Sequence, residues 1–153
     1  MKTLVVYDSV YGNTEAIAKA IGSACKATTL RVGEVKAEQL EGLDFLIVGS
    51  PTQAFQPLPT VKAFLRSLPA GSLKGVKVAS FDTRADVQQV GNRLLTFLVR
   101  LFGYAAEPMM RMLEKKGGVC AVSPIGFIVN EKEGPLKEGE EERASQWAIQ
   151  VLG

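Results

Sequence analysis

Strand-like and helix-like patterns alternate along the whole chain, and this alternation constrains the fold more than any other feature. The first apolar run, at 4–7, reads Leu-Val-Val-Tyr without interruption, as in a strand that is buried on both faces of a parallel sheet. A helical pattern follows at 13–24, where apolar residues recur three and four positions apart. Repeated strand–helix units of this kind build parallel βαβ structure. The sequence therefore predicts an α/β fold.

The remaining patterns complete a series of five strands. Further strands are expected at 28–32, 45–49, 76–81 and 119–129, the last interrupted around Pro124 and Gly126, and further helices at 35–40, 59–68, 106–113 and 144–152. A doubly wound sheet with five parallel strands is commonly ordered 2-1-3-4-5, and we predict that order. Trp147 shares its helix face with alanines and valine, so we expect it in the core. Because no linker or shift in composition divides the chain, 1–153 is expected to form a single domain.

Composition excludes several classes of function. The chain has no histidine and no Cys-x-x-Cys pair, which argues against a transition-metal site and against the usual histidine-based triads. A net charge of +2 without basic clusters does not indicate a nucleic-acid-binding protein. No transmembrane segment or signal peptide is apparent, so we expect a cytoplasmic protein with Cys25 and Cys120 reduced. If the chain performs chemistry, a bound cofactor is expected to supply it.

The loop after the first strand has a composition suited to binding an anion. It reads Ser-Val-Tyr-Gly-Asn-Thr at 9–14 and runs directly into a helix. Hydroxyl groups, a glycine and the free amides of a helix N-terminus can together hold a phosphate without any lysine. The loop matches neither the Gly-x-Gly-x-x-Gly pattern nor a Walker loop. Ordinary helix capping by serine or threonine explains the same residues, and both interpretations stay open on this evidence.

The segment from Val5 to Ile21 closely resembles the N-terminal FMN-phosphate signature of flavodoxins. The shared pattern is an apolar strand, an aromatic residue, a serine or threonine, and then Gly-Asn-Thr at the start of a helix. This resemblance implies that the phosphate of FMN is bound by Ser9, Tyr11, Gly12, Asn13 and Thr14. Tyr11 is a departure, because many flavodoxins carry a threonine there, and one hydroxyl group is therefore displaced or lost.

The loop after the third strand also resembles the flavodoxin family. It reads Gly-Ser-Pro-Thr-Gln-Ala-Phe-Gln-Pro at 49–57, where flavodoxins line the flavin ring. The resemblance implies cofactor contacts from Ser50, Pro51, Thr52, Gln53 and Phe55. The Phe55 ring is expected to stack on the flavin, with packing into the core as the alternative.

The segment after the fourth strand takes the place of the family's third flavin loop. The resemblance implies that Asp82, Thr83 and Arg84 contact the cofactor, although the tyrosine that often stacks there in flavodoxins is not evident. Tyr104 is distant in sequence and is not assigned a role. For Arg84 the alternative is a solvated surface position, which is the usual environment of a single arginine.

The resemblance covers nearly the whole chain and implies a short-chain flavodoxin. Such a protein is an FMN-binding electron carrier that passes electrons between a reductase and an acceptor protein through semiquinone and hydroquinone states. Because the net charge is +2 rather than strongly acidic, we expect a less negative hydroquinone potential than in acidic relatives, with Arg84 as the first residue to test.

Two other functions remain as alternatives. One is an FMN-dependent oxidoreductase, such as a quinone reductase or a protoporphyrinogen-oxidase-like protein, that acts on an apolar substrate. The other is a flavin-free signalling domain of the same fold, for which the single Asp8 is a poor match because such domains need an acidic cluster.

The stretch 82–104 fits the predicted series of strands and helices least well. From Leu94 to Phe102 it carries seven apolar residues, and Arg93, Thr96 and Arg100 form the only polar stripe of the expected helix. A helix this apolar is normally buried, so we expect it to cover the sheet or the cofactor, and in the enzyme alternative an apolar substrate. The other interpretation is an exposed surface for a homodimer or for partner docking.

Overall fold

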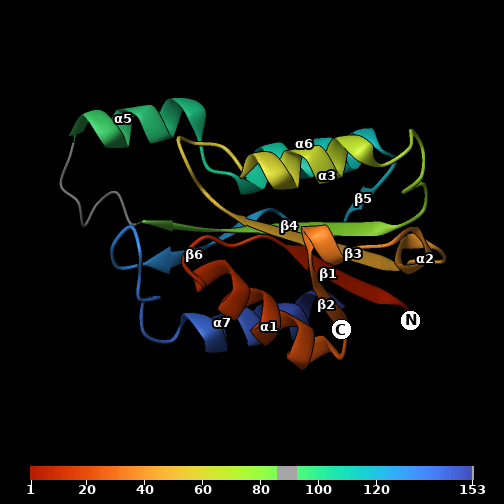
Figure 1. The fold of residues 1–153 in the computed structure, drawn as a ribbon. Coiled ribbons are helices and arrows are strands. Elements are labelled where there is room, and N and C mark those ends of the chain that lie inside the picture. Colours follow the sequence, from red (N-terminus) through yellow and green to blue (C-terminus); the bar gives the residue numbers. More distant parts are fainter. Residues whose placement is uncertain (86–92, 153) are drawn as a thin grey trace.

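The computed structural model describes residues 1–85 and 93–152 and has the alternating strands and helices predicted from the sequence (Figure 1). The strands are β1 (Thr3–Tyr7), β2 (Thr28–Arg31), β3 (Phe45–Pro51), β4 (Lys77–Ala85), β5 (Val119–Cys120) and β6 (Ile125–Val129). The helices are α1 (Asn13–Cys25), η1 (Val32–Glu34), α2 (Ala37–Leu40), α3 (Pro59–Ser67), α5 (Arg93–Phe102), α6 (Ala106–Lys115) and α7 (Glu140–Leu152).

The strands form one parallel sheet in the order β2-β1-β3-β4-β5, which confirms the predicted α/β fold and strand order. The predicted interruption of the last strand is also present. Its first part, β5, pairs with the beginning of β4 through Lys77 and Val119, and its second part, β6, pairs with the end of β4 through Phe81 and Ile125. Both parts therefore lie beside the same neighbour, and the sheet extends furthest at the carboxyl end of β4.

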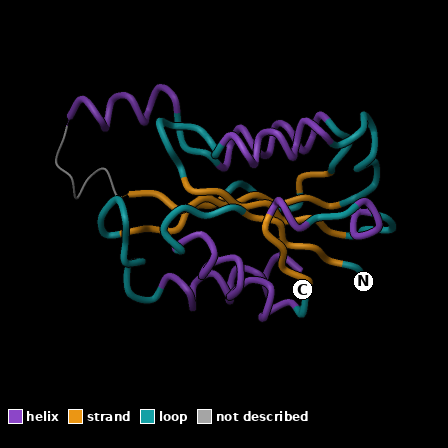
Figure 2. Tube along the Cα trace, in the orientation of Figure 1, coloured by secondary structure: helices purple, strands orange, loops and turns teal. Residues whose placement is uncertain are grey.

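Helices cover both faces of the sheet, with α3 and α6 on one side and α1 and α7 on the other (Figures 1 and 2). Successive side chains of a strand point to opposite faces. Leu4 and Val6 accordingly pack into the cluster under α3 and α6, whereas Val5 and Tyr7 pack into the cluster under α1 and α7. Trp147 belongs to the second cluster and is 7% exposed, so its predicted core position is confirmed.

Two strands run further than the sequence predicts. β3 ends at Pro51 and β4 at Ala85, so Ser50, Pro51 and 82–84 belong to strands rather than to loops. The pairing continues on both sides of β4. Asp82 of β4 pairs with Ser50 of β3 on one side and with Gly126 of β6 on the other. Pairing with β6, which is distant in sequence, extends a segment whose polar residues suggested a loop.

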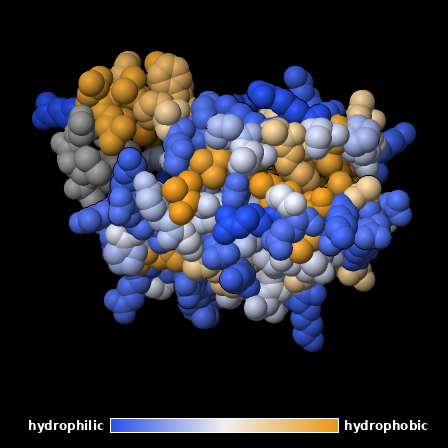
Figure 3. Space-filling model, in the orientation of Figure 1, coloured by the Kyte–Doolittle hydropathy of each residue, from blue (hydrophilic) through white to orange (hydrophobic). Residues whose placement is uncertain are grey.

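The helix predicted from Leu94 to Phe102 forms as α5, but it does not cover the sheet. None of its residues is buried, and α5 stands apart from α3 and α6 at one end of the molecule (Figures 1 and 2). In the space-filling view, apolar side chains gather over this helix (Figure 3). The expectation of a covering element over the sheet is therefore wrong for the described residues. Residues 86–92 of the stretch 82–104 lie outside the description.

None of the helices in the described part of the chain has the length and hydropathy needed to cross a bilayer. Both cysteines, Cys25 and Cys120, are free thiols.

Candidate functional site

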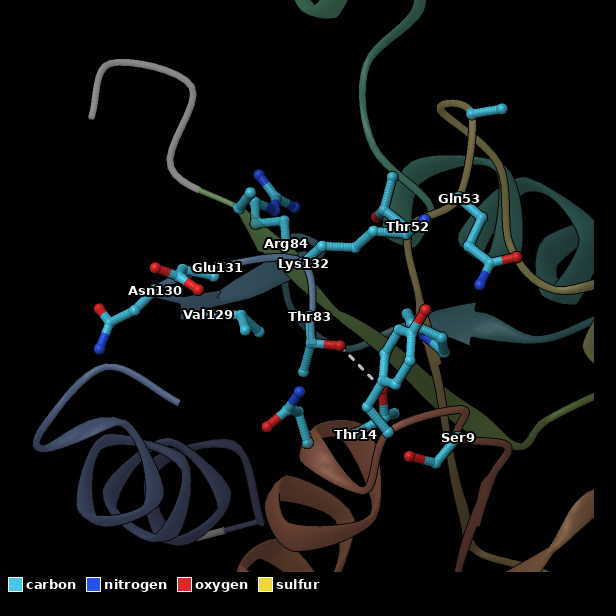
Figure 4. Close-up of a pocket in the computed structure, with 15 residues that line it drawn as sticks. Ser9, Thr14, Thr52, Gln53, Thr83, Arg84, Val129, Asn130, Glu131 and Lys132 are labelled. Atoms are coloured by element: carbon cyan, nitrogen blue, oxygen red, sulfur yellow. Dashed lines mark hydrogen bonds between the residues drawn. The ribbon is translucent and has the colours of Figure 1, made fainter. Parts of the chain in front are cut away.

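A cavity of about 650 Å³ opens at the carboxyl edge of the sheet, where four segments meet (Figure 4). The segments are the β1–α1 loop, the end of β3 with its following loop, the end of β4, and the end of β6 with its following loop. The lining residues are Ser9, Tyr11, Asn13, Thr14, Pro51, Thr52, Gln53, Ala54, Thr83, Arg84, Ala85, Val129, Asn130, Glu131 and Lys132. Open α/β sheets bind ligands at this edge, and the volume lies within the usual range for ligand pockets.

Most of the predicted site residues lie together in this cavity. They are Ser9, Tyr11, Asn13, Thr14, Pro51, Thr52, Gln53, Thr83 and Arg84. The other predicted residues, Gly12, Ser50, Phe55 and Asp82, are close to it in sequence but are not among its lining residues. The resemblance therefore selected segments that the fold brings to one place.

The sequence analysis missed the fourth wall, which consists of Val129, Asn130, Glu131 and Lys132. These residues carry no recognisable motif. Their position follows from the parallel pairing of β6 with β4, because the carboxyl ends of parallel neighbours reach the same edge of a sheet. The predicted interruption of the last strand was thus a usable signal, since it moves the second half of that strand toward the cavity.

The N-terminus of α1 is arranged to accept an anion. Its N-cap is Gly12, whose φ of 94° lies in the left-handed region that favours glycine. The Gly12 amide donates to Ser9 Oγ at 3.0 Å, and no side chain makes a cap hydrogen bond to the first turn. The first backbone bond runs from the Ala16 amide to the Gly12 carbonyl at 3.0 Å. Serine or threonine capping is therefore not realised at the N-cap, and the amides of 13–15 point toward the cavity end of the helix without intrahelical acceptors.

The side chains of the first turn tie α1 to two other walls. The hydroxyl oxygens of Thr14 and Thr83 lie 2.8 Å apart in a buried hydrogen bond between α1 and β4, drawn as a dashed line in Figure 4. The Asn13 side-chain amide donates to the Glu133 carbonyl at 3.1 Å. These bonds fix the position of the helix N-terminus relative to the rest of the cavity.

An aspartate–arginine pair lies behind the β1–α1 loop. Arg31 Nη1 lies 2.7 Å from Asp8 Oδ1 and donates to the Ser9 carbonyl at 3.2 Å. The hydroxyl of Thr60 and the amide of Ser9 also donate to the Asp8 carboxylate. Burial alone would raise the pKa of Asp8, but the hydrogen bonds from Thr60, the Ser9 amide and Arg31 hold this pKa below its ordinary value.

Arg31 also joins this pair to α1. Its Nη2 lies 3.3 Å from Glu15 Oε2, and the Tyr7 hydroxyl donates to the same oxygen at 2.8 Å. The hydrogen bond from Tyr7 lowers the pKa of Glu15, and the charges of Lys19 and Arg31 add to this effect. The loop that holds the anion-binding amides is therefore anchored from β1, β2 and α1.

A second aspartate–arginine pair lies at the end of β4. Arg84 Nε and Nη2 donate to the two oxygens of Asp82, each at 2.6 Å, and the Ala106 amide donates to the same carboxylate at 2.9 Å. Burial raises the pKa of Asp82, against the opposing effect of these donors. The Arg84 side chain is 17% exposed and its guanidinium carbon lies 3.6 Å from the centre of the Tyr104 ring. Arg84 is thus not the solvated surface residue considered as an alternative.

Gly126 leaves the space that this arginine occupies. A Cβ atom on Gly126 would lie 2.1 Å from Arg84 Nε and 2.2 Å from its guanidinium carbon. Gly126 pairs with Asp82 in the neighbouring strand β6, so the glycine and the ion pair lie side by side. Neither this glycine nor Tyr104 was assigned to the site from the sequence, because both contacts arise only when β4, β6 and the α5–α6 connection come together.

The loop after β3 is held by backbone and hydroxyl contacts. The Thr52 amide donates to the Thr83 carbonyl, and Thr52 Oγ1 accepts from the Ala105 amide, both at 3.0 Å. Phe55 has a φ of 68° and lies against Phe102 of α5, with ring centres 5.6 Å apart. It does not pack into either core cluster, so the core alternative for Phe55 is wrong.

Ser50 has a structural role. Its hydroxyl donates to the Pro51 carbonyl at 2.8 Å and accepts from the Leu58 amide at 2.9 Å, and the residue is fully buried. These bonds fix the direction in which the chain leaves β3. Ser50 therefore shapes the cavity wall from behind.

Both the sequence and the structure of the chain are similar to those of known proteins. Residues 4–96 match a family model described as a flavodoxin domain. The structure is similar to oxidised Flavodoxin 1 from Bacillus cereus, with a TM-score of 0.76, 17% identity, and coverage of 99% of this chain and 97% of that chain. Flavodoxin 2 from the same organism gives a TM-score of 0.72 at 23% identity over 99% and 98% of the two chains.

A further similar structure is the flavodoxin, WrbA-like protein from Agrobacterium tumefaciens, with a TM-score of 0.74, 21% identity, and coverage of 98% of this chain and 94% of that chain. At these identities the structural likeness shows the fold alone. No curated protein sequence matches the chain.

Proposed function

The chain belongs to the flavodoxin family, and we propose that it binds one FMN in the cavity and passes single electrons between redox partner proteins. Family membership supports the general role of a flavin-binding electron-transfer protein. The choice of FMN rests mainly on one observation: the N-terminus of α1 opens into a cavity of about 650 Å³ with its first-turn amides uncapped by side chains. A phosphate is the group that such a helix end binds best.

The residues present fit this cofactor along the whole cavity. In our proposal the amides of 13–15 and the hydroxyl groups of Ser9 and Tyr11 bind the phosphate. Thr52, Gln53, Thr83 and Arg84 also line the cavity, and in our proposal they contact the ribityl chain and the ring. FMN supplies the redox chemistry when it is bound, and the protein orients it, excludes water and sets the surrounding charge.

The first experiment is a visible absorption spectrum of the purified protein, followed by titration of FMN into the apoprotein. We expect flavin bands and tight binding. Gly12→Ala removes the residue that permits the left-handed N-cap, so we expect affinity for FMN to fall by roughly tenfold or more. Gly71→Ala is the matched control, because Gly71 also has positive φ, at 75°, but lies in the α3–β4 connection at the opposite edge of the sheet.

The outcomes of this experiment separate the proposal from its competitors. A protein that stays colourless and does not take up FMN would exclude both FMN-dependent functions. Equal affinity for FMN in the two alanine variants would show that the α1 terminus does not hold the phosphate. During anaerobic photoreduction, bleaching in two one-electron stages supports a carrier, whereas a single two-electron stage favours an enzyme.

An FMN-dependent oxidoreductase with an apolar substrate is the second candidate. One observation favours it: α5 presents exposed apolar side chains and contacts the loop after β3 through Phe102 and Phe55. Steady reduction of a quinone by NADPH, with the purified protein and no separate reductase, would support this function.

The flavin-free signalling domain is disfavoured. Asp8, its sole candidate acceptor, is held by Arg31 and Thr60. In addition, no group of three or more acidic, histidine or cysteine side chains able to hold a metal ion occurs among the residues that the structure describes.

A further inference from the structure

The outer face of α5 is the most apolar exposed feature of the described chain. Leu94, Phe97, Leu101 and Phe102 are 66%, 60%, 63% and 56% exposed. Four side chains of roughly 200 Å² each, exposed to this degree, present about 500 Å² of apolar surface. A patch of about 300–600 Å² is the largest that a typical monomer exposes, and such a patch is often functional. Figure 3 shows it at one end of the molecule, away from the helices that cover the sheet.

The polar side of the same helix is basic. Arg93 and Arg100 are both exposed, and α5 contains no acidic residue. They are seven residues apart, so they lie on the same side of the helix two turns from each other. No acidic group of the described chain lies within 4 Å of either guanidinium group. Phe97 follows Arg93 by four positions and precedes Arg100 by three, so both cations border the exposed apolar face.

We propose that α5 docks on the surface of a lipid bilayer that carries anionic headgroups. A short helix with exposed leucine and phenylalanine on one face and arginine beside it lies in the membrane interface, with the apolar side chains at the acyl boundary and the cations at the headgroup phosphates. Ten residues of helix span about 15 Å, half the thickness of the hydrocarbon core, so α5 lies on the membrane rather than across it.

The charge beside the patch favours an anionic membrane over a second copy of the chain. Two arginines beside the apolar face would repel each other's copies in a symmetric dimer, whereas anionic headgroups attract both. The helix also stands out from the body of the molecule, so it can meet a flat surface (Figures 1 and 2).

Docking would bring one wall of the cavity to the membrane. Phe102 contacts Phe55, and the Ala105 amide just after α5 bonds to Thr52, which lines the cavity. The docking itself does not depend on the proposed cofactor, since α5 has its arginines and its apolar face with or without a flavin.

Co-sedimentation with vesicles tests the proposal, using vesicles of phosphatidylcholine alone and vesicles that also contain phosphatidylglycerol. We expect the full chain to bind the anionic vesicles and to prefer them by roughly tenfold or more, with binding that weakens as salt is added. The double variant Phe97→Ser, Leu101→Ser is expected to lower binding by roughly tenfold or more. The double variant Arg93→Gln, Arg100→Gln is expected to abolish the preference for anionic lipid.

Two matched controls lie on other helices. Ile149→Ser removes an equally exposed apolar side chain from α7, at 59% exposure, and Arg111→Gln removes an exposed cation from α6; neither is expected to change vesicle binding. Because α5 buries no residue, its variants are expected to keep the unfolding temperature of the parent chain, which checks that they fold.

Three outcomes would overturn the proposal. The first is that the parent chain does not bind the anionic vesicles. The second is that it binds them and the α5 variants bind equally well. The third is that light scattering shows a stable dimer that the Phe97→Ser, Leu101→Ser variant dissociates, because the occupant of the face is then a second copy of the chain.

Discussion

Two aspartate–arginine pairs lie at the carboxyl edge of the sheet, and they are stabilised in different ways. At the end of β1, Asp8 is 15% exposed and shares Arg31 with neutral donors, and its pKa is lowered. At the end of β4, the Asp82 side chain is fully buried and depends on one arginine for its charge balance, and its pKa is raised. The first carboxylate keeps other donors if its arginine is lost, whereas among the described residues the second would keep only the Ala106 amide.

This difference divides the proposed site into two functional parts. The β1 pair lies behind the loop that carries the anion-binding amides, and water can reach the arginine there, whose side chain is 39% exposed. The β4 pair borders the cavity directly through Arg84. At the end of β4, Asp82 and Arg84 therefore affect both the stability of the fold and the charge at the cavity. At the end of β1, Asp8 and Arg31 stabilise the loop, whereas the anion-binding amides belong to other residues.

The largest effect is expected from Arg84→Gln, compared with Arg31→Gln. Loss of Arg84 leaves a buried carboxylate without its counter-ion, and we expect the free energy of unfolding to fall by about 3 kcal/mol. Loss of Arg31 removes a partly exposed pair, so the fall is expected to be below about 1 kcal/mol. Urea unfolding of the two variants measures both values. Equal losses would mean that the two pairs do not differ in the way that their burial indicates.

Gly126→Ala tests whether the β4 pair needs the space beside it. The new Cβ would overlap the guanidinium group of Arg84, and we expect a loss of about 1–3 kcal/mol from the displaced ion pair. Gly33→Ala is the control, because a Cβ there meets nothing within 4 Å and its φ is not positive. In the double variant with Arg84→Gln, the loss in the free energy of unfolding should be smaller than the sum of the two single-variant losses. Strict additivity would show that Gly126 acts through another contact.

These contacts also show where sequence-based prediction reached its limit. The patterns at 4–7, 13–24 and 45–49 reflect local burial, and they were sufficient to predict the strands and helices. The strand order was predicted from the orders that are common in doubly wound sheets. The end of β4 was predicted at 81 because three polar residues follow. Alternation places Asp82 and Arg84 on the same side of the strand, where they neutralise each other, and β6 supplies the backbone partners. Such non-local compensation has no sequence signature.

The same limit explains the helix α5 and the fourth wall of the cavity. The pattern from Leu94 to Phe102 correctly predicted a helix, because periodicity reports how side chains are distributed around it. It does not report what lies against each face, so the predicted burial against the sheet is wrong, whereas the predicted contact with a cofactor stays a prediction. Val129 to Lys132 lie in the cavity only because β6 pairs with β4, and their side chains match no motif for anion or flavin binding.

Acid titration should separate the two aspartates by the sign of their contributions. The folded pKa values of Asp8 and Glu15 are lowered, so their stabilisation is present above the ordinary carboxylate pKa of about 4 and is lost as the pH falls through their folded values. The folded pKa of Asp82 is raised, so its contribution has the opposite sign and is lost as the pH rises through that value.

Asp8→Asn is therefore expected to make the free energy of unfolding fall less steeply below about pH 4 than in the parent chain, by less than about 1 kcal/mol in total. Urea unfolding across the acid range measures the slope. Glu138→Gln, a change at an exposed position away from both pairs, serves as the control. A parent-like slope in Asp8→Asn would show that Asp8 is not held in its ionised form by the network around Arg31.

The smallest effect is expected on the reduction potential of the FMN-loaded protein. A cation beside the ring stabilises reduced, anionic flavin, so Arg84→Gln should lower the potential, as predicted from the sequence. Asp82 lies in direct contact with Arg84 and burial raises its pKa, so without the arginine this carboxyl group is expected to take up a proton. The net charge beside the ring then changes little, and the shift is expected to be small. Arg31→Gln, which alters the pair behind the phosphate loop, should move the potential less than Arg84→Gln. If the order of the two shifts is reversed, the ring lies nearer the β1 pair, and the proposed orientation of FMN along the cavity is wrong.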